Sequence, residues 1–516
     1  MRILGAVLAS AACLALALPD AGLWPLAFVA WTPLLLVLPR TGAWKALLAG
    51  WLAGALANAA IFHWISHTAI SMSSFPPIAA AGVLAAYAAW SGLSVGVAAL
   101  LVRPLAAGRL AALTVPAAVV VVEWLWPHLF PWHLGNAFFR VPLLLQGMDV
   151  TGVYGGSFVA VSVAASVASV LRAGGRARFL AFVPAAVVLA AWLGYGAVRL
   201  AQVRDAAPAG VVRLALVQPD ITAEDKKHKD AASRKALFAR LTGLTGSADL
   251  SRVDAVVWPE GAFPFYFALD AGGRKGWENV VETSRRLVEF VRGTGKTLVF
   301  GSLTKPGDRA RNSVVMLGPD GAEVGRYDKR KLLAFGEYMP LSDVFTGLKK
   351  AVKEVSDMEA GTRPVALPIG GAKALPSICY EAILPTFTRE ALEETGADLV
   401  LNFTNDAWFG ESGAPAQHLM VQVPRAVELR VPLVRQTETG ISAIVTAAGD
   451  FVHETGVHER RVDLVDVAYG AGVSSPYRAI GDLFAWLCAA GTLAAIGVPA
   501  VARYRSGKKS RSARMG

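Results

Sequence analysis

The polarity of the chain changes twice, and these changes divide it into three parts. Apolar residues run almost without interruption through the first 200 positions, become short and intermittent over 211–470, and return as one long run at 479–502. Runs of roughly 20 apolar residues are long enough to cross a bilayer as helices. The pattern therefore predicts a polytopic α-helical membrane protein that carries a largely polar domain between its last two spans.

Eight apolar runs are candidate spans. They cover residues 3–19, 22–38, 46–66, 78–102, 110–127, 154–171, 179–198 and 479–502. We expect a seven-span membrane domain over 1–200, an eighth helix at 479–502 and a basic cytoplasmic tail at 503–516. Arg2 before the first run also suits a signal peptide, but no small-residue cleavage site separates the first two runs, so a retained helical hairpin is expected.

The shorter strands and helices of the middle part predict an α/β domain over 211–470. Strands are expected at Val212–Gln218, Ala255–Pro259, Thr297–Leu303, Ser313–Leu317, Ala374–Cys379, Asp398–Thr404, Leu433–Glu438 and Ser442–Ala447. Helices are expected at 229–247, 275–293, 384–395 and 415–430.

Composition agrees with a bilayer as solvent, because 54% of the 516 residues are hydrophobic and the mean hydropathy is +0.45. Fourteen basic residues fall on one side if eight spans alternate, with no acid among them: Arg2, Arg40, Lys45, Arg103, Arg109, Arg172, Arg176, Arg178, Arg503, Arg505, Lys508, Lys509, Arg511 and Arg514. That side should be the cytoplasm, which places 211–470 on the opposite side. The net charge of +11 is therefore a topology signal and gives no support to a nucleic-acid partner.

A few ionisable residues lie at the predicted membrane helices. Glu123 and Asp482 are costly there unless paired or hydrated, and the sequence leaves open whether each is an interfacial cap or a functional group. His63 and His67 have the spacing of metal ligands on a helix, but no acidic residue lies near them in the sequence. We therefore expect no metal site and no organic cofactor.

Cys379 is the only cysteine in the polar domain, since Cys13 and Cys488 lie in apolar runs. A thiol near pKa 8.5 needs a base to become a nucleophile, and Glu260 is placed after a predicted strand to serve as one. Lys329 follows Tyr327-Asp328 and offers an ammonium that would stabilise the oxyanion formed when the thiol attacks an acyl carbonyl. The three side chains together predict acyl-transfer chemistry.

The order of these segments resembles the nitrilase superfamily of carbon–nitrogen hydrolases and acyltransferases. Within it, seven spans before the domain and one after are similar to the apolipoprotein N-acyltransferases of bacterial inner membranes. The resemblance covers nearly the whole chain and rests on these segments: Phe130-Pro-Trp132, Gly135, Trp258-Pro-Glu260, Tyr327-Asp-Lys329, Phe335-Gly-Glu337, Ile378-Cys-Tyr-Glu381, Asn405-Asp-Ala-Trp-Phe-Gly410, Gln417-His418, Arg425-Ala-Val-Glu428 and Thr439-Gly-Ile-Ser442.

The resemblance implies an αββα sandwich in which Glu260 is the base, Lys329 the oxyanion stabiliser and Cys379 the nucleophile. Residues that match positions supporting that site are Glu337, Tyr380 and Glu381. It further implies that a phospholipid donates an acyl chain to Cys379, and that the α-amine of an S-diacylglyceryl cysteine on an apolipoprotein accepts it. The protein would then be a multi-pass enzyme of the bacterial inner membrane with its catalytic domain in the periplasm.

Three positions depart from the family pattern; none of them belongs to the proposed triad, and the last two bear on the detail of substrate binding. Ala334 replaces a usual proline, Glu438 a common asparagine, and Lys227 is loosely aligned with a frequent tryptophan. The basic run from Lys226 to Lys229 is expected to be a solvated face, with contact to anionic lipid headgroups left open.

Four aromatic residues follow Glu260 closely, at Phe263, Phe265, Tyr266 and Phe267. They either pack in the core or form a hydrophobic lip that admits acyl chains, and the membrane setting favours the lip.

Two other functions remain open from the sequence. A membrane-tethered amidohydrolase would use the same three residues with water as the final acceptor, and a non-catalytic membrane scaffold would tolerate replacement of Cys379.

Overall fold

The computed structural model describes residues 2–19, 21–73, 75–227, 230–339 and 357–512. Residue 229 of one predicted helix and residues 513–516 of the predicted tail lie outside these ranges. The chain divides into two compact units. One, the membrane unit, comprises Met1–His63, Ala81–Leu200 and Ala479–Gly516, and the other, the catalytic unit, comprises Trp64–Ala80 and Ala201–Arg478.

The membrane unit is helical. Its α-helices are α1 (Ile3–Leu16), α2 (Thr32–Val37), α3 (Ala43–Ile61), α5 (Pro77–Val102), α6 (Ala111–Leu125), α7 (Pro142–Leu145), α8 (Met148–Thr151), α9 (Val153–Arg172), α10 (Arg176–Asp205) and α19 (Leu483–Ser512). Its 3-10 helices are η1 (Trp24–Phe28), η2 (Leu38–Arg40) and η3 (Leu134–Phe138). Helices α5 and α10 each continue for a few residues into the catalytic unit.

Four of the described helices, α3, α5, α9 and α10, are long and apolar enough to cross a membrane. Shorter apolar helical segments occupy Ile3–Leu16, Trp24–Arg40, Ala111–Leu125 and Leu483–Val498. The chain therefore has the apolar helices of a membrane protein, and the number that spans stays a prediction. The run at 22–38 is three short helices, because Pro25, Pro33 and Pro39 each lack an N–H and restrict the residue before them.

Small residues let α3 and α5 approach closely. Gly50 and Gly54 on α3 meet Gly92 and Gly96 on α5, two pairs with the four-residue spacing that places both glycines on one helix face. A Cβ added at Gly92 would lie 2.3 Å from the backbone nitrogen of Ala55. Close backbone packing of this kind replaces the hydrophobic effect as a source of helix association in lipid.

The catalytic unit contains two six-stranded sheets. The first has the order β12-β1-β2-β3-β4-β5, formed by Arg461–Tyr469, Gly210–Gln218, Ala255–Trp258, Thr297–Thr304, Arg311–Leu317 and Glu323–Asp328. The second has the order β11-β10-β9-β8-β7-β6, formed by Phe451–Glu454, Ala443–Val445, Leu433–Thr437, Leu399–Thr404, Ala372–Ile378 and Leu367–Ile369.

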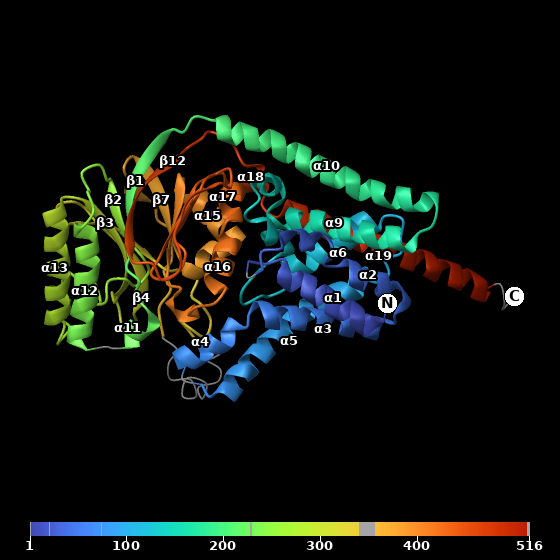
Figure 1. Cartoon of the computed structure of the whole chain (residues 1–516), viewed down its shortest axis with the longest axis horizontal. Helices are drawn as coiled ribbons and strands as arrows, with labels where there is room; N and C mark the ends of the chain where they lie inside the picture. The colour runs from blue at the N-terminus through green and yellow to red at the C-terminus, as the bar shows by residue number, and fades with distance from the viewer. Residues whose placement is uncertain (1, 20, 74, 228–229, 340–356, 513–516) are drawn as a thin grey trace. The chain divides into compact units, whose positions relative to one another are not determined.

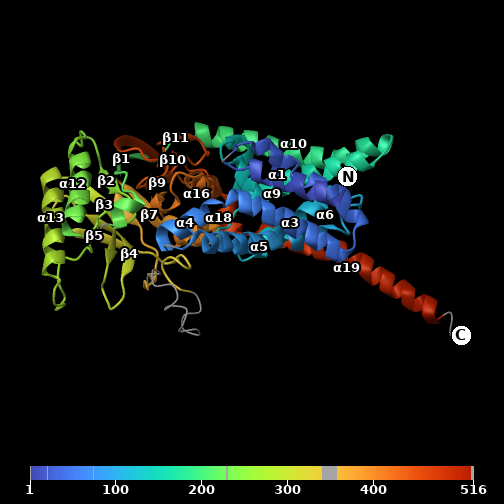
Figure 2. The same ribbon diagram turned by 60° about the horizontal axis from the view of Figure 1, so that its bottom comes forward.

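Helices cover the outer face of each sheet. Figure 1 shows α12 (Ala231–Gly246) and α13 (Glu278–Thr294) outside the first sheet, and α15 (Pro385–Thr395), α16 (Ala414–Gln422) and α17 (Pro424–Leu429) outside the second. Figure 2 shows the same layers from another side. The predicted αββα sandwich is confirmed. Shorter helices among the described residues of the unit are α4 (Trp64–Ser73), α11 (Ala223–Lys227), η4 (Cys379–Ile383) and η5 (Ala407–Phe409), and α18 (Pro476–Ile480) begins at its end.

Strand β1 shows how the sequence builds the layers. Leu214 and Leu216 belong to the core between the two sheets, whereas Ala215 and Val217 belong to the core beneath α12 and α13. Successive side chains of a strand point to opposite faces, so a strand buried on both sides must be apolar at every position.

Two of the four aromatic rings predicted to form a lipid lip are core residues. Phe263 and Phe267 are 2% and 1% exposed, and their rings lie edge to face with Phe300 at 5.8 and 5.3 Å between centroids. Phe265 and Tyr266 are half-buried. The lip prediction is therefore wrong for Phe263 and Phe267, because rings enclosed in the sandwich cannot line a passage for acyl chains.

Replacing Phe267 with serine should destabilise the protein by at least about 3 kcal/mol, because it leaves a cavity in the core and buries a hydroxyl. The half-buried Phe265→Ser is the matched comparison and should cost clearly less. Thermal unfolding of the purified variants in detergent measures both. An equal loss of stability for the two would show that Phe267 is no more enclosed than Phe265.

Candidate active site

The three predicted catalytic residues follow the ends of three strands. Glu260 comes two residues after β2, Lys329 directly after β5 and Cys379 directly after β7. The loop with Glu260 lies against β3 so closely that a Cβ at Gly301 would be 2.5 Å from the carbonyl oxygen of Pro259. Only glycine at this position permits that approach.

Glu260, Lys329 and Glu337 form one buried charged cluster. The Lys329 Nζ lies 2.8 Å from Glu337 Oε2 and 3.8 Å from Glu260 Oε1. The Asn312 amide donates to both carboxylates, at 2.8 Å to Glu260 and 2.9 Å to Glu337. The backbone N–H of Asn405 donates to the other oxygen of Glu260 at 2.8 Å. These contacts fix the orientation of Glu260 and Lys329, which are only 8% and 2% exposed.

Cys379 lies in a strained turn. Its φ is +50°, a region that residues other than glycine seldom adopt, and the chain continues through η4 into α15. Such conformations persist when the surrounding structure enforces them, and they cluster at functional sites. The turn projects the half-buried thiol from the end of a buried strand.

Glu381 connects the turn of Cys379 to the turn of Lys329. One of its carboxylate oxygens accepts the N–H of Ile378 at 2.8 Å, next to the thiol-bearing residue. The other accepts the Tyr327 hydroxyl at 2.7 Å and the N–H groups of Arg330 and Lys331 at 2.7 and 3.0 Å. Glu381 is fully buried. Its hydrogen bonds fix the turn of Cys379 relative to the turn of Lys329. Its predicted supporting position thus has a physical basis.

Burial and neighbouring charges shift the ionisation of the cluster. Burial raises the pKa of Glu260, with Lys329 opposing that rise and Glu337 adding to it. Burial also raises the pKa of the Cys379 thiol well above its usual value; Glu260 adds to the rise and Lys329 opposes it. Burial alone would lower the pKa of Lys329, but the carboxylates of Glu337 and Glu260 outweigh it and raise that pKa. The site therefore favours a neutral thiol beside a basic carboxylate and a fixed ammonium.

Tyr380, the remaining predicted supporting residue, follows the thiol and is half-buried. Burial raises the pKa of its phenol, so the hydroxyl stays protonated at neutral pH and can act only as a neutral hydrogen-bonding group.

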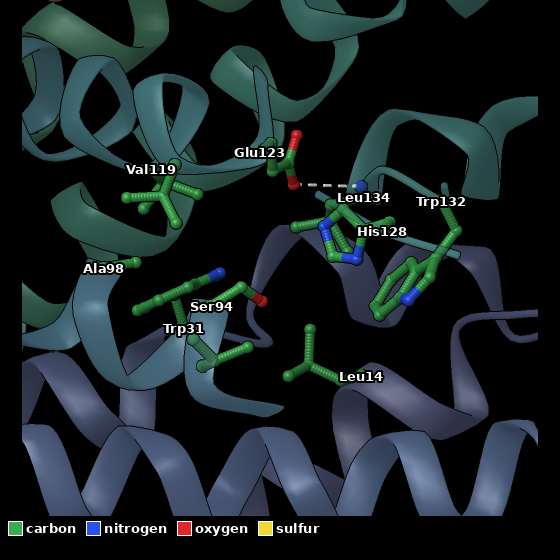
Figure 3. Close-up of a pocket in the computed structure, with 11 residues that line it drawn as sticks. Leu14, Trp31, Ser94, Ala98, Val119, Glu123, His128, Trp132 and Leu134 are labelled. Carbon is green, nitrogen blue, oxygen red and sulfur yellow. Dashed lines mark hydrogen bonds between the residues drawn. The ribbon is translucent and has the colours of Figure 1, made fainter. Parts of the chain in front are cut away.

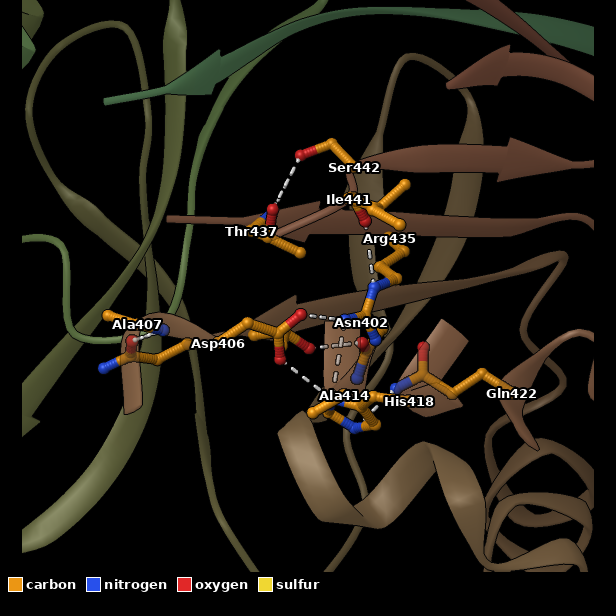
Figure 4. Close-up of polar contacts among 12 residues, drawn as sticks. Asn402, Asp406, Ala407, Ala414, His418, Gln422, Arg435, Thr437, Ile441 and Ser442 are labelled. Carbon is orange, nitrogen blue, oxygen red and sulfur yellow. Dashed lines mark hydrogen bonds and ion pairs between the residues drawn. The ribbon is translucent and has the colours of Figure 1, made fainter. Parts of the chain in front are cut away.

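A second polar group lies beside Cys379. Asp406 accepts hydrogen bonds from His418, at 2.9 Å, and from Arg435, and Figure 4 shows the carboxylate between them. A Cβ at Gly440 would lie 2.2 Å from Asp406 Oδ2, which explains a glycine there. The Asp406 charge contributes to the raised pKa of Cys379, so this group borders the thiol.

Sequence reasoning missed Asn312 and gave Asp406 and His418 no role. Asn312 lies within β4, where nothing distinguishes it from other polar strand residues. Asp406 and His418 did fall in segments that carry the family resemblance, and their partner Arg435 lies in β9, a strand that is buried at every position. A buried arginine in such a strand is a signal, because a charge there requires a partner.

The membrane unit holds a separate small pocket, lined in part by Glu123, His128 and Trp132 (Figure 3). Glu123 Oε1 accepts the N–H of Leu134 at 3.2 Å, where η3 begins. This hydrogen bond is consistent with a capping role, one of the two possibilities that the sequence left open.

The fold and the strand-end residues define the catalytic unit as a domain of the carbon–nitrogen hydrolase class. The family profile described as Carbon-nitrogen hydrolase matches residues 213–471, and the profile described as Apolipoprotein N-acyltransferase N-terminal domain matches residues 10–166. The chain belongs to the apolipoprotein N-acyltransferase family.

Two relatives illustrate the extent of the match. The apolipoprotein N-acyltransferase of Geobacter metallireducens is 35% identical over 93% of this chain and 92% of its own length. That of Rhizobium rhizogenes is 32% identical over 94% of this chain and 93% of its own length. Among solved structures, the NitN amidase of Nesterenkonia sp. AN1 is 21% identical and covers 52% of this chain and 95% of the amidase, with a TM-score of 0.37.

Proposed function

We propose that this protein transfers an acyl chain from a membrane phospholipid to the N-terminal amine of an S-diacylglyceryl apolipoprotein, through a thioester on Cys379. The buried cluster of Glu260, Lys329 and Glu337 beside the Cys379 turn carries this proposal. Family membership over nearly the whole chain supports the choice of substrates.

In the first half-reaction Glu260 removes the proton from the Cys379 thiol as the sulfur attacks the ester carbonyl. The raised pKa values of both groups fit this step, because a thiol that does not ionise by itself needs a base and a carboxylate of raised pKa is a stronger one. Lys329 stabilises the negative charge on the carbonyl oxygen. The ester C–O bond then breaks, and Glu260 returns the proton to the alkoxide of the departing lysophospholipid.

In the second half-reaction the neutral α-amine of the apolipoprotein attacks the thioester carbonyl. Glu260 takes a proton from the attacking nitrogen, Lys329 again stabilises the oxyanion, and the C–S bond breaks. The thiolate recovers its proton from Glu260, which restores the resting enzyme and leaves an amide on the lipoprotein.

Phospholipid with a labelled sn-1 acyl chain, incubated with the purified protein and a diacylated lipoprotein, tests the proposal. The label should appear in a hydroxylamine-resistant amide on the lipoprotein, with one lysophospholipid released per amide. Label recovered as free fatty acid, with the lipoprotein unmodified, would instead identify the membrane-tethered hydrolase.

The proposed location is the bacterial inner membrane, with the catalytic unit in the periplasm and the tail in the cytoplasm. The fourteen basic loop and tail residues that share one side support this orientation.

A cysteine introduced at Ala322, in the exposed turn between β4 and β5, should react with a membrane-impermeant maleimide in intact spheroplasts. A cysteine at Lys508 should react only after lysis. Both are measured in a variant whose native cysteines are replaced, and the reverse pattern would contradict the orientation.

A further inference from the structure

Lys226 is turned inward, although the basic run that contains it was expected to face solvent. Its Nζ lies 2.6 Å from Glu438 Oε2, and its side chain is 20% exposed while that of Glu438 is fully buried. Burial raises the pKa of Glu438 to about 7, and Lys226 opposes that rise. Glu438, which differs from the usual family residue, is thus paired with Lys226. Lys226 directly precedes Lys227, another position that differs from the family pattern.

The loop that carries Lys226 is anchored at several points. The N–H of Asp220, just after β1, donates to the carbonyl oxygen of Glu438 at 2.9 Å. Asp225 accepts the N–H of Thr222 at 3.0 Å and pairs with Arg240 at 3.1 Å. These contacts give Lys226 a defined position, which a lysine on a solvated face does not have.

Lys226 lies beside the buried charged cluster that contains Glu260. A Cβ at Gly261, the residue after Glu260, would lie 3.6 Å from the Lys226 Nζ. The ammonium also lies 6.0 Å from the ring centroid of Trp408. Its charge lowers the pKa of Glu260, which is consistent with this proximity.

Lys226 differs in exposure from two other described cations of the catalytic unit, Lys329 and Arg435. The side chains of Lys329 and Arg435 are 2% and 0% exposed, and each is paired with a buried carboxylate. Lys226 is 20% exposed, so of these three it is the cation most accessible from outside the buried cluster. An ammonium has three donor hydrogens, so an ion pair with Glu438 does not occupy all of them.

We propose that Lys226, oriented by Glu438, binds the phosphate group of the phospholipid donor and so selects phosphate-bearing esters for attack by Cys379. This inference rests on the proposed function, which supplies the phospholipid. A lysine ammonium is a strong phosphate-binding group. The buried carboxylate keeps the long side chain ordered before the lipid arrives, which reduces the entropy lost on binding.

The test compares two reactions of Cys379 by intact-protein mass spectrometry. One is acylation by phosphatidylethanolamine in detergent micelles, and the other is alkylation by iodoacetamide, a small neutral reagent that has no phosphate. Lys226→Met should lower kcat/KM for acylation about ten- to a hundredfold, as expected for the loss of one charge-assisted hydrogen bond. Its alkylation rate should stay within about twofold of wild type, and Lys226→Arg should recover most of the acylation.

Two further variants separate this role from others. Lys227→Met, on the same short helix but solvent-exposed and paired with Glu224, should acylate like wild type. Lys226→Met leaves the buried Glu438 carboxylate without its cation. The double variant Lys226→Met/Glu438→Gln removes that carboxylate charge as well and should keep the acylation defect.

Four results would overturn the inference: wild-type acylation by Lys226→Met, an equal loss in both reactions, an equal loss for Lys227→Met, or recovery in the double variant. Failure of the wild-type protein itself to become acylated would instead count against the proposed function.

Discussion

Glu260→Gln should reduce formation of the acyl-enzyme by at least about a hundredfold, while the protein stays folded. Glutamine has nearly the same volume but cannot accept the thiol proton, and a positioned base contributes about a hundred- to ten-thousandfold. The Cys379 thiol depends strongly on that base because its own pKa is raised. The rate of thioester formation from phospholipid is the measurement.

The substitution also affects local hydrogen bonds, so stability must be measured in parallel. Glu260 accepts from Asn312 and from the N–H of Asn405, and an amide can accept only one of them. The expected cost is about 1 kcal/mol. Glu289→Gln, on the exposed face of α13, is the matched control and should be fully active. A Glu260→Gln protein within tenfold of wild type would remove Glu260 from the role of base.

Lys329→Met should lower acylation by about a hundred- to a thousandfold, because the oxyanion loses its fixed ammonium. It should also destabilise the fold by about 3–5 kcal/mol, since Glu337 and Glu260 would lose the cation between them in a buried cluster. Thioester formation and thermal unfolding measure the two effects.

A second substitution separates catalysis from stability. Lys329→Met/Glu337→Gln removes one of the two unpaired carboxylates, so it should recover much of the lost stability but little of the lost activity. Lys331→Met, exposed and two residues away, should behave like wild type. Recovery of activity in the double variant would mean that Lys329 serves only to neutralise Glu337.

The strands of the sandwich core were predictable because they are apolar on both faces. The predicted strand Thr297–Leu303, for example, differs from β3 only by one residue at its end. Strands β5, β6, β11 and β12 were missed. β11 and β12 are half-exposed and carry charged residues, Glu454 in β11 and Asp463 and Asp466 in β12, so their strand character comes from pairing with neighbours. The predicted helix at 415–430 is two helices, α16 and α17, because Pro424 cannot continue the first one.

The residues that follow strand ends were also predictable, since strand ends are where α/β domains expose functional side chains. Their partners were not. Asn312 reaches Glu260 only because β4 pairs with β3 in a particular register, and Lys226 meets Glu438 across more than 200 residues of chain. The burial of Phe263 and Phe267 depends equally on tertiary packing, since an aromatic loop in the sequence looks the same whether it packs inward or faces lipid.

Intact-protein mass spectrometry after incubation with phosphatidylethanolamine, in the absence of any acceptor, tests the central claim most directly. A two-step transfer must store the acyl group before the second substrate binds. The account predicts one acyl adduct, mapped to Cys379 and released by neutral hydroxylamine. A protein that acylates lipoprotein yet never carries this adduct would contradict it.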